Sequence, residues 1–152
     1  MKILLDTNIL VHAYNKDSPN QKEAYTIVKK AMQGEIDACL TAQVLYELFA
    51  VVTNPKRVEK TLSIKDAADL CTDLWECDEI EKIIPSEVTP IEVFKLVKFF
   101  SLCRAEIFDC NLVVIAKENG VDTICTENVD DFKCYSFVKT WNPFEKSSIG
   151  QK

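Results

Sequence analysis

The sequence of 152 residues contains only one histidine and three glycines. Catalysis by two imidazoles, one acting as acid and the other as base, is excluded by the single His12. The chain also lacks a G-x-S-x-G elbow, a Walker A loop and a G-x-G-x-x-G motif, which excludes the enzymes that depend on them. We interpret His12, which we expect in the first helix, as a packing or hydrogen-bonding residue.

Long apolar runs are absent as well. No stretch approaches the roughly 20 apolar residues that span a bilayer. The N-terminus has only Lys2 and a short apolar run before it turns polar, which is not the pattern of a signal peptide. We therefore expect a cytoplasmic protein that does not associate with membranes.

Seven cysteines are present, but their spacing does not indicate a metal site or a disulfide scaffold. No C-x-x-C pair exists, and His12 has no cysteine near it in the sequence, which excludes the usual structural zinc motifs. An odd number of cysteines without a signal peptide indicates reduced and mostly buried thiols. The cysteines are Cys39, Cys71, Cys77, Cys103, Cys110, Cys125 and Cys134.

The formal net charge is −6, and 28% of the residues are charged. An acidic protein does not bind nucleic acid by charge alone. The exception is a site whose acidic residues hold divalent cations, which then contact the phosphates. The acidic residues therefore decide what this chain can bind.

Strand-like and helical segments alternate along the chain with few linkers. The apolar run Ile3–Leu5 predicts a strand that is buried on both faces. We expect further strands at 38–40, 81–84, 121–125 and 135–138. Capping boxes at 18–21 and 89–92 predict two helix starts, and Ser63 predicts a third. We expect helices at 42–53 and 108–119 too, with Gly34 and Gly120 as the ends of two of the helices.

Strands separated by helices of this length predict β-α-β crossovers and a parallel sheet that is covered on both faces. At this length, one domain over residues 1–145 is expected. Residues 146–152 are polar and lack periodicity, so we expect a frayed C-terminal tail.

Acidic residues occur at four places where the predicted elements end or begin. Asp6 follows the first strand, Glu47 lies within an apolar helix, and Asp109 opens another helix. The fourth place is the segment after the strand at 121–125, which contains Thr126, Asn128, Asp130 and Asp131. Because strand ends and helix starts converge on one edge of a doubly wound sheet, we expect these side chains to meet there.

Each place also has a purely structural explanation. Asp6 is a good helix N-cap, and Asp109 could simply favour the positive end of its helix. Asp130 and Asp131 could be turn residues, and Glu47 could form a salt bridge to Arg104 or to a lysine. Gathered together, however, the carboxylates would repel one another and raise one another's pKa unless cations neutralise them. Oxygen-only ligands suit Mg²⁺ or Mn²⁺.

These motifs resemble those of the PIN-domain nucleases, and especially the VapC-type toxins of toxin–antitoxin pairs. The resemblance covers nearly the whole chain and consists of five segments in order. They are the opening at 4–10, Tyr46-Glu47-Leu48 with the following Thr53-Asn54-Pro55, the segment 108–116, the segment 126–132, and Trp141-Asn142-Pro143-Phe144. The fold that this implies is a three-layer α/β/α sandwich with a central parallel sheet of about five strands.

The resemblance implies hydrolysis of RNA phosphodiester bonds with one or two Mg²⁺ or Mn²⁺ ions, to leave a 5′-phosphate and a 3′-hydroxyl. Asp6 and Asp109 match the residues that hold the ion most directly, and Glu47 matches the third acid, which binds metal or orients water. Thr7, Asn8 and Thr126 are expected to orient the carboxylates or the phosphate. The resemblance also implies an RNA substrate, a homodimer and an antitoxin partner.

The fourth segment departs from the pattern, because Asn128 stands where many family members have aspartate. A neutral amide binds a second metal more weakly, and Asp131 or Asp130 is expected to substitute. An alternative from another class is a PIN-like RNA-binding or assembly module with little or no catalytic activity. A phosphatase of the haloacid-dehalogenase type fits poorly, because the chain has Asp6-Thr7-Asn8 where D-x-D-x-T is required.

Overall fold

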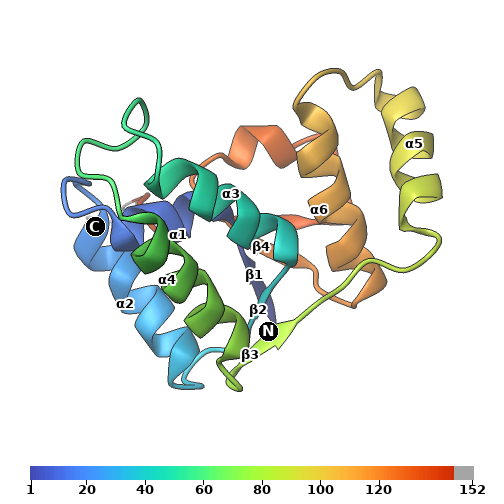
Figure 1. The fold of residues 1–152 in the computed structure, drawn as a ribbon. Helices are drawn as coiled ribbons and strands as arrows, with labels where there is room; N and C mark the ends of the chain where they lie inside the picture. Colours follow the sequence, from blue (N-terminus) through green and yellow to red (C-terminus); the bar gives the residue numbers. More distant parts are fainter. Residues whose placement is uncertain (146–152) are drawn as a thin grey trace, which may run out of the picture.

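Five short strands form the centre of the structure, a computed structural model that describes residues 1–145 (Figure 1). The sheet has the order β3-β2-β1-β4-β5, and every neighbouring pair is parallel. The predicted parallel sheet is therefore confirmed. The strands are β1 (Ile3–Leu5), β2 (Ala38–Leu40), β3 (Ile80–Lys82), β4 (Thr123–Cys125) and β5 (Lys139–Trp141).

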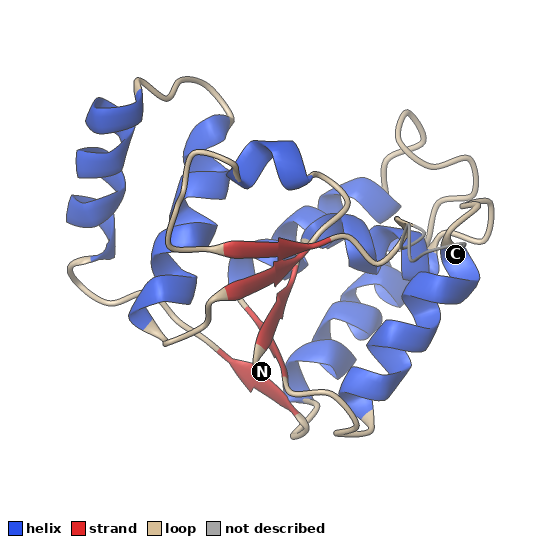
Figure 2. Cartoon of the chain, turned by 180° about the vertical axis from the view of Figure 1, so that it is seen from behind, coloured by secondary structure: helices blue, strands red, loops and turns tan. Residues whose placement is uncertain are grey.

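Helices connect the strands and cover both faces of the sheet. In Figures 1 and 2, α1, α2 and α4 lie on one side of the sheet and α5 and α6 on the other. The helix α3 packs against α1 and α4. The helices are α1 (Thr7–Tyr14), α2 (Gln21–Met32), α3 (Ala42–Val52), α4 (Ile64–Glu76), α5 (Thr89–Phe100) and α6 (Glu106–Glu118), followed by the 3₁₀ helix η1 (Val129–Phe132).

The side chains of each strand agree with its position at the centre or at the edge of the sheet. All residues of β1, β2 and β4 are buried, as expected for apolar strands between two helical layers. The two edge strands are more exposed and carry charged residues such as Glu81 and Lys139. The chain reverses its direction across the sheet between β1 and β4, so the carboxyl ends of these two strands form the topological switch point where such folds bind ligands. Asp6 is the first residue after β1, and Thr126 is the first residue after β4.

Several predicted boundaries were wrong. The segment 135–138 forms turns, and β5 begins only at Lys139. The aromatic residues of that segment alternate as in a strand, but they serve tertiary packing instead. The buried Tyr135 packs edge-on against Phe100 and Phe137. The strand at 81–84 is Ile80–Lys82, and the strand at 121–125 begins at Thr123.

Both predicted capping boxes were wrong, whereas the cap at Ser63 is confirmed. Helix α2 begins at Gln21, and the Ser18 hydroxyl instead accepts the backbone N–H of Asn20. Thr89 is already within α5, and its hydroxyl accepts from Ser86 and donates to Glu118 of α6. In contrast, Ser63 accepts the backbone N–H of Asp66 at 3.0 Å, as a helix N-cap does.

All seven cysteines are free thiols, as predicted. Three are buried, two are partly buried, and Cys103 and Cys134 are exposed, so the thiols are less uniformly buried than expected. Burial raises the pKa of Cys39 and Cys125 to about 12, which makes both thiols inert at neutral pH.

No helix in residues 1–145 is both long and apolar enough to cross a membrane. The predicted tail, residues 146–152, lies outside the described residues.

Candidate active site

A cleft of about 500 Å³ lies at the carboxyl ends of β1 and β4. Four elements contribute its acidic walls: the start of α1, the middle of α3, the first turn of α6 and the segment that contains η1. The structure therefore brings together all five residues that the sequence predicted as catalytic, together with Thr7 and Asn8. These five are Asp6, Glu47, Asp109, Asn128 and Asp131.

Asp6 lies at the floor of this cleft, and its side chain is held on both oxygens. Its Oδ1 accepts the backbone N–H of Thr7 at 2.7 Å, so Asp6 also caps α1. Its Oδ2 accepts the side-chain amide of Asn8 at 2.8 Å and the hydroxyl of Thr126 at 2.7 Å. Burial raises the pKa of Asp6, these hydrogen bonds lower it, and the nearby charge of Glu47 raises it, with a net rise.

Thr126 joins the ends of the two central strands and is completely buried. Besides donating to Asp6, its hydroxyl oxygen accepts the Asn8 amide at 2.9 Å and the Asn128 backbone N–H at 3.0 Å. The Asn8 carbonyl oxygen in turn accepts the backbone N–H of Glu127 at 3.0 Å. These contacts position the segment after β4 against the start of α1.

Glu47 is held by neutral partners on both oxygens. Its Oε2 accepts the Thr7 hydroxyl at 2.9 Å, and its Oε1 accepts the side-chain amide of Gln43 at 2.8 Å. The salt bridge to Arg104 or to a lysine does not form among residues 1–145. Gln43 was not predicted from the sequence, although its position four residues before Glu47 on the same helix face is a usable signal.

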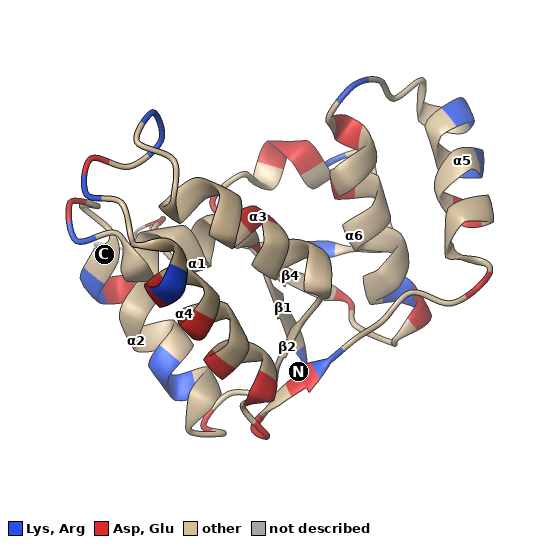
Figure 3. Cartoon of the chain, in the orientation of Figure 1, with Lys and Arg blue, Asp and Glu red and all other residues tan. Residues whose placement is uncertain are grey.

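The pKa of the Asp109 carboxyl is raised well above its ordinary value. Desolvation by burial is the main cause, and the charges of Asp131, Asp6, Glu47 and Glu106 add to it, which together raise its pKa to about 7. The helix α6 begins at Glu106 rather than at the predicted 108, so Asp109 lies within the first turn. In Figure 3 the acidic segment at the start of α6 lies close to the acidic residues of η1.

The two neighbouring aspartates after β4 differ in their positions. Asp131 faces the cleft, whereas Asp130 does not line it and forms an ion pair with Lys133. Asn128 lines the cleft and caps η1 with its backbone, but its side chain makes no capping hydrogen bond. Of the two acids that could substitute for an aspartate at 128, only Asp131 is therefore in place.

His12 lies at the edge of the cleft and makes hydrogen bonds with both ring nitrogens, in agreement with its predicted role. Its Nδ1 pairs with the Ser18 hydroxyl at 2.6 Å, and its Nε2 pairs with Glu127 at 2.7 Å. Arg57, from the loop after α3, also lines the cleft.

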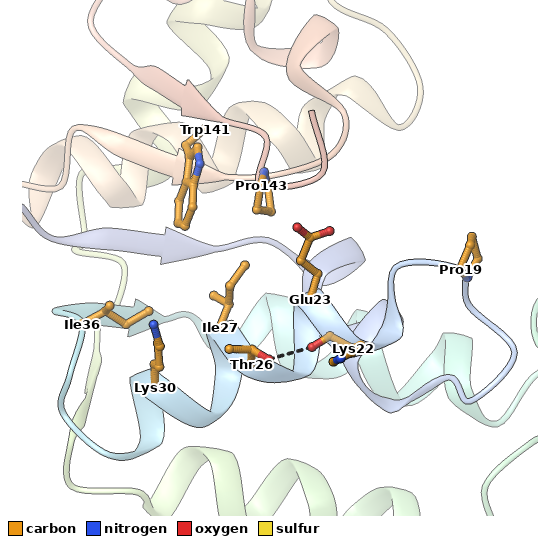
Figure 4. Close-up of a pocket in the computed structure, with 9 residues that line it drawn as sticks. All are labelled: Pro19, Lys22, Glu23, Thr26, Ile27, Lys30, Ile36, Trp141 and Pro143. Carbon is orange, nitrogen blue, oxygen red and sulfur yellow. Dashed lines mark hydrogen bonds between the residues drawn. The ribbon is translucent and has the colours of Figure 1, made fainter. Parts of the chain in front are cut away.

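A second hollow, of about 580 Å³, lies between α2 and the end of β5. There, Trp141 and Pro143 face Glu23, Ile27 and Lys30 of α2 (Figure 4). None of the predicted site residues lines this hollow. The acidic cleft is therefore the candidate active site.

The sequence pattern of the PIN domain matches residues 2–130, which is most of the chain. The chain belongs to the PIN-domain family. The resemblance that the motifs indicated is thus confirmed, and so is the expected PIN-like fold, a five-stranded parallel sheet between helices.

Among curated proteins, this PIN-domain chain is similar to Ribonuclease VapC24 of Mycobacterium tuberculosis. The two are 28% identical over 139 residues, which is 91% of this chain and 94% of the relative. This is a distant similarity over nearly the full length of both chains.

Solved structures with the same fold come from several bacteria. VapBC2 from Rickettsia felis, bound to a DNA fragment from its promoter, has a TM-score of 0.64 at 21% identity and covers 93% of this chain and 98% of that one. VapBC-1 from nontypeable Haemophilus influenzae has a TM-score of 0.64 at 15% identity, and the match covers 95% of this chain and 100% of that one. VapC20 of M. tuberculosis, a toxin that cleaves the sarcin–ricin loop, has a TM-score of 0.61 at 13% identity, with 90% and 97% covered.

The donor set of the PIN-domain cleft suits a hard divalent cation. It offers carboxylate and amide oxygens but no thiol, which fits Mg²⁺ or Mn²⁺. No three His, Cys, Asp or Glu side chains within the described part of the chain already have the arrangement of a metal site. Burial is the main cause of the raised pKa of Asp109, and the charges of neighbouring acids add a repulsion that a cation would relieve.

Proposed function

We propose that this protein is a divalent-metal-dependent ribonuclease that hydrolyses RNA phosphodiester bonds, and that it is the toxin of a VapBC-type pair. The observation that carries this proposal is the convergence of Asp6, Glu47 and Asp109 in one cleft, where burial and like charges raise the pKa of Asp109 to about 7. The similarity to a VapC ribonuclease supports the choice of RNA as the substrate.

Asp6, Asp109 and Glu47 would hold Mg²⁺ or Mn²⁺, with Asn128 and Asp131 available for a second ion. When bound, such an ion supplies charge for the phosphate and a water of lowered pKa. The oxygens of Asp6 are oriented by Thr7, Asn8 and Thr126, which limits their reorganisation when charge develops. Arg57 at the cleft wall provides a cation for the RNA backbone.

We also propose an antitoxin protein as partner, a homodimer as the assembly and the cytoplasm as the location. The antitoxin is supported by the solved structures of similar fold, which include a toxin–antitoxin complex from Klebsiella pneumoniae and a DNA-bound VapBC from Salmonella typhimurium. The acidic cleft would attract a basic segment of an antitoxin by charge complementarity.

A second candidate function is a PIN-like module that binds RNA and has little or no catalytic activity. Two observations favour it: the neutral Asn128 in the fourth motif, and the absence of a ready-made metal-ligating trio from residues 1–145. The module would bind RNA in a gel-shift assay without cleaving it in either metal.

The test is cleavage of a mixed pool of tRNA and rRNA fragments by purified protein, with Mg²⁺, with Mn²⁺ and with EDTA. Asp6→Asn removes the charge and keeps a good helix cap, so its loss of activity would not reflect a lost helix. Asp130→Asn is the matched control, because Asp130 lies outside the cleft and pairs with Lys133. We expect metal-dependent cleavage by the wild type and the control only. RNA binding without cleavage in either metal would favour the module.

A further inference from the structure

The side chain of Gln43 links two of the acidic residues through their helices. Its Nε2 donates to Oε1 of Glu47 at 2.8 Å and to the backbone carbonyl oxygen of Phe108 at 3.1 Å. Its Oε1 accepts the side-chain amide of Asn111 at 2.6 Å. Gln43 therefore connects Glu47 on α3 to the residues on either side of Asp109 in α6.

The orientation of this amide is determined by its partners. A carboxylate and a backbone carbonyl can only accept hydrogen bonds, so the NH₂ group must face Glu47 and Phe108. If the amide were turned over, its oxygen would face two acceptors, and the Asn111 amide would face a second NH₂ group. Only one orientation satisfies all three contacts, which makes Gln43 a rigid connection.

Glu47 depends on this connection because it has few other contacts. Within the described residues, the only other hydrogen bond of the Glu47 side chain is the one that its Oε2 accepts from the Thr7 hydroxyl. Glu47 forms no ion pair with any of these residues. A glutamate side chain has three rotatable bonds, and without Gln43 one oxygen would be free to turn toward water. A carboxylate that changes its orientation is a poorer metal ligand than one held in place.

We propose that Gln43 is a positioning residue for the candidate active site: it orients the Glu47 carboxylate toward the cleft and sets its position relative to Asp109. This inference rests on the proposed metal-dependent function and assigns to Gln43 a role that acts through Glu47. Asn111 supports the same role because it holds the oxygen of the Gln43 amide.

The experiment compares Gln43→Met, which keeps the length of the side chain and removes its hydrogen bonds, with the wild type. The matched control is Thr89→Val, which also removes a side-chain hydrogen bond to α6. The Thr89 hydroxyl donates to Glu118 at 2.5 Å, and Glu118 lies at the opposite end of α6 from Asp109. Mn²⁺ affinity is measured by calorimetry on the metal-free protein, and kcat and KM are measured with RNA. The same substitution is also made in a Glu47→Gln background.

We expect Gln43→Met to weaken Mn²⁺ binding about tenfold, as loss of a partner that orients a metal ligand does. The value of kcat should fall while KM changes less than about twofold, because Gln43 does not line the cleft that takes up RNA. Thr89→Val should leave Mn²⁺ affinity unchanged. In the Glu47→Gln background, Gln43→Met should have no further effect, because its role acts through the Glu47 carboxylate.

Wild-type Mn²⁺ affinity and kcat in Gln43→Met would overturn the inference, and so would a full additional loss in the Glu47→Gln background. Both results would leave the proposed function intact, because the wild type would still cleave. A wild type that neither binds Mn²⁺ nor cleaves RNA would overturn the proposed function and this inference with it. If Gln43→Met does not fold, Asn111→Leu provides the same test by releasing the Gln43 amide.

Discussion

The carboxylate of Asp109 should destabilise the metal-free protein, and its removal should therefore stabilise the fold. Its pKa is raised from 3.8 to about 7, first by burial and then by the charges of Asp131, Asp6, Glu47 and Glu106. A rise of about three pKa units corresponds to roughly 4 kcal/mol between the two protonation states. Because the side chain is only half-buried, screening by water and salt reduces this to about 1–2 kcal/mol.

The sign of the pH dependence follows from the raised pKa. Between about pH 4 and pH 7 the unfolded state has released the proton of Asp109 while the folded state still holds it, so the folded state binds more protons. Stability therefore falls as the pH rises through this window, and the full penalty is present above pH 7. The substitution Asp109→Asn removes a charge but no hydrogen bond of the side chain, since Asp109 accepts none among residues 1–145.

We expect Asp109→Asn to melt about 3–6 °C above the wild type at pH 8 in EDTA, for a protein of this size. The difference should shrink as the pH is lowered toward 4, and it should reverse when Mn²⁺ stabilises the wild type. Thermal unfolding followed by circular dichroism measures this, with Asp130→Asn as the control for removal of an exposed charge. Equal or lower stability of Asp109→Asn at pH 8, or a difference that does not change with pH, would refute the reasoning.

Three further predictions concern the site and the fold. Thr126→Val removes a buried donor to Asp6 and should cost about 1–3 kcal/mol in urea unfolding; an unchanged midpoint would contradict the role of Thr126. Ser63→Ala removes the cap of α4 and should cost about 1 kcal/mol in the same assay without changing Mn²⁺ affinity. Free Mn²⁺ at a hundred times its Kd should add about 2.7 kcal/mol to the stability of the wild type, and EDTA should abolish this gain; no gain would argue against a metal site.

Much of the fold was predictable because apolar patterns determine the local elements. Ile3–Leu5 has no polar alternation, and it forms the central strand, buried on both faces. The segment at 135–138 shows where such patterns fail. Its alternation of Tyr135 and Phe137 is that of a strand, but the Tyr135 ring packs edge-on between Phe100 and Phe137, and the strand begins only at Lys139. Only the tertiary packing distinguishes these two outcomes.

The capping boxes failed for a related reason. Thr89 has the local pattern of a helix cap, but its hydroxyl donates to Glu118, which is distant in sequence and becomes a neighbour only when α5 and α6 pack together. A hydroxyl that can bond locally or across the fold takes the partner that packing provides. Ser63 is exposed and has no competing side-chain partner among residues 1–145 beyond its own helix, so there the local pattern was a sound guide.

The acidic residues of the site were predictable one by one, whereas the contacts that orient them were not. Asp6 could be identified because a carboxylate after a buried strand at a sheet edge has few explanations. Its bond to Thr126 joins residues 120 positions apart, and the bond between Gln43 and Asn111 joins residues 68 apart. The first contact depends on the pairing of β1 with β4 and the second on the packing of α3 with α6, and hydrophobic periodicity specifies neither.

The cleft gathers its acids in a way that a fold selected only for stability would avoid. Asp6 could cap α1 as an asparagine, and Glu47 and Asp109 have no ion pair among residues 1–145 that would compensate their charge. Yet burial and repulsion raise the pKa of both Asp6 and Asp109, so the folded state bears an electrostatic cost at neutral pH. The neutral side chain of Thr126 orients the Asp6 carboxylate, and that of Gln43 orients the Glu47 carboxylate, without neutralising either charge. An arrangement that orients negative charge and leaves it uncompensated is suited to a positively charged ligand, and the hydrogen bonds around it determine where that ligand binds.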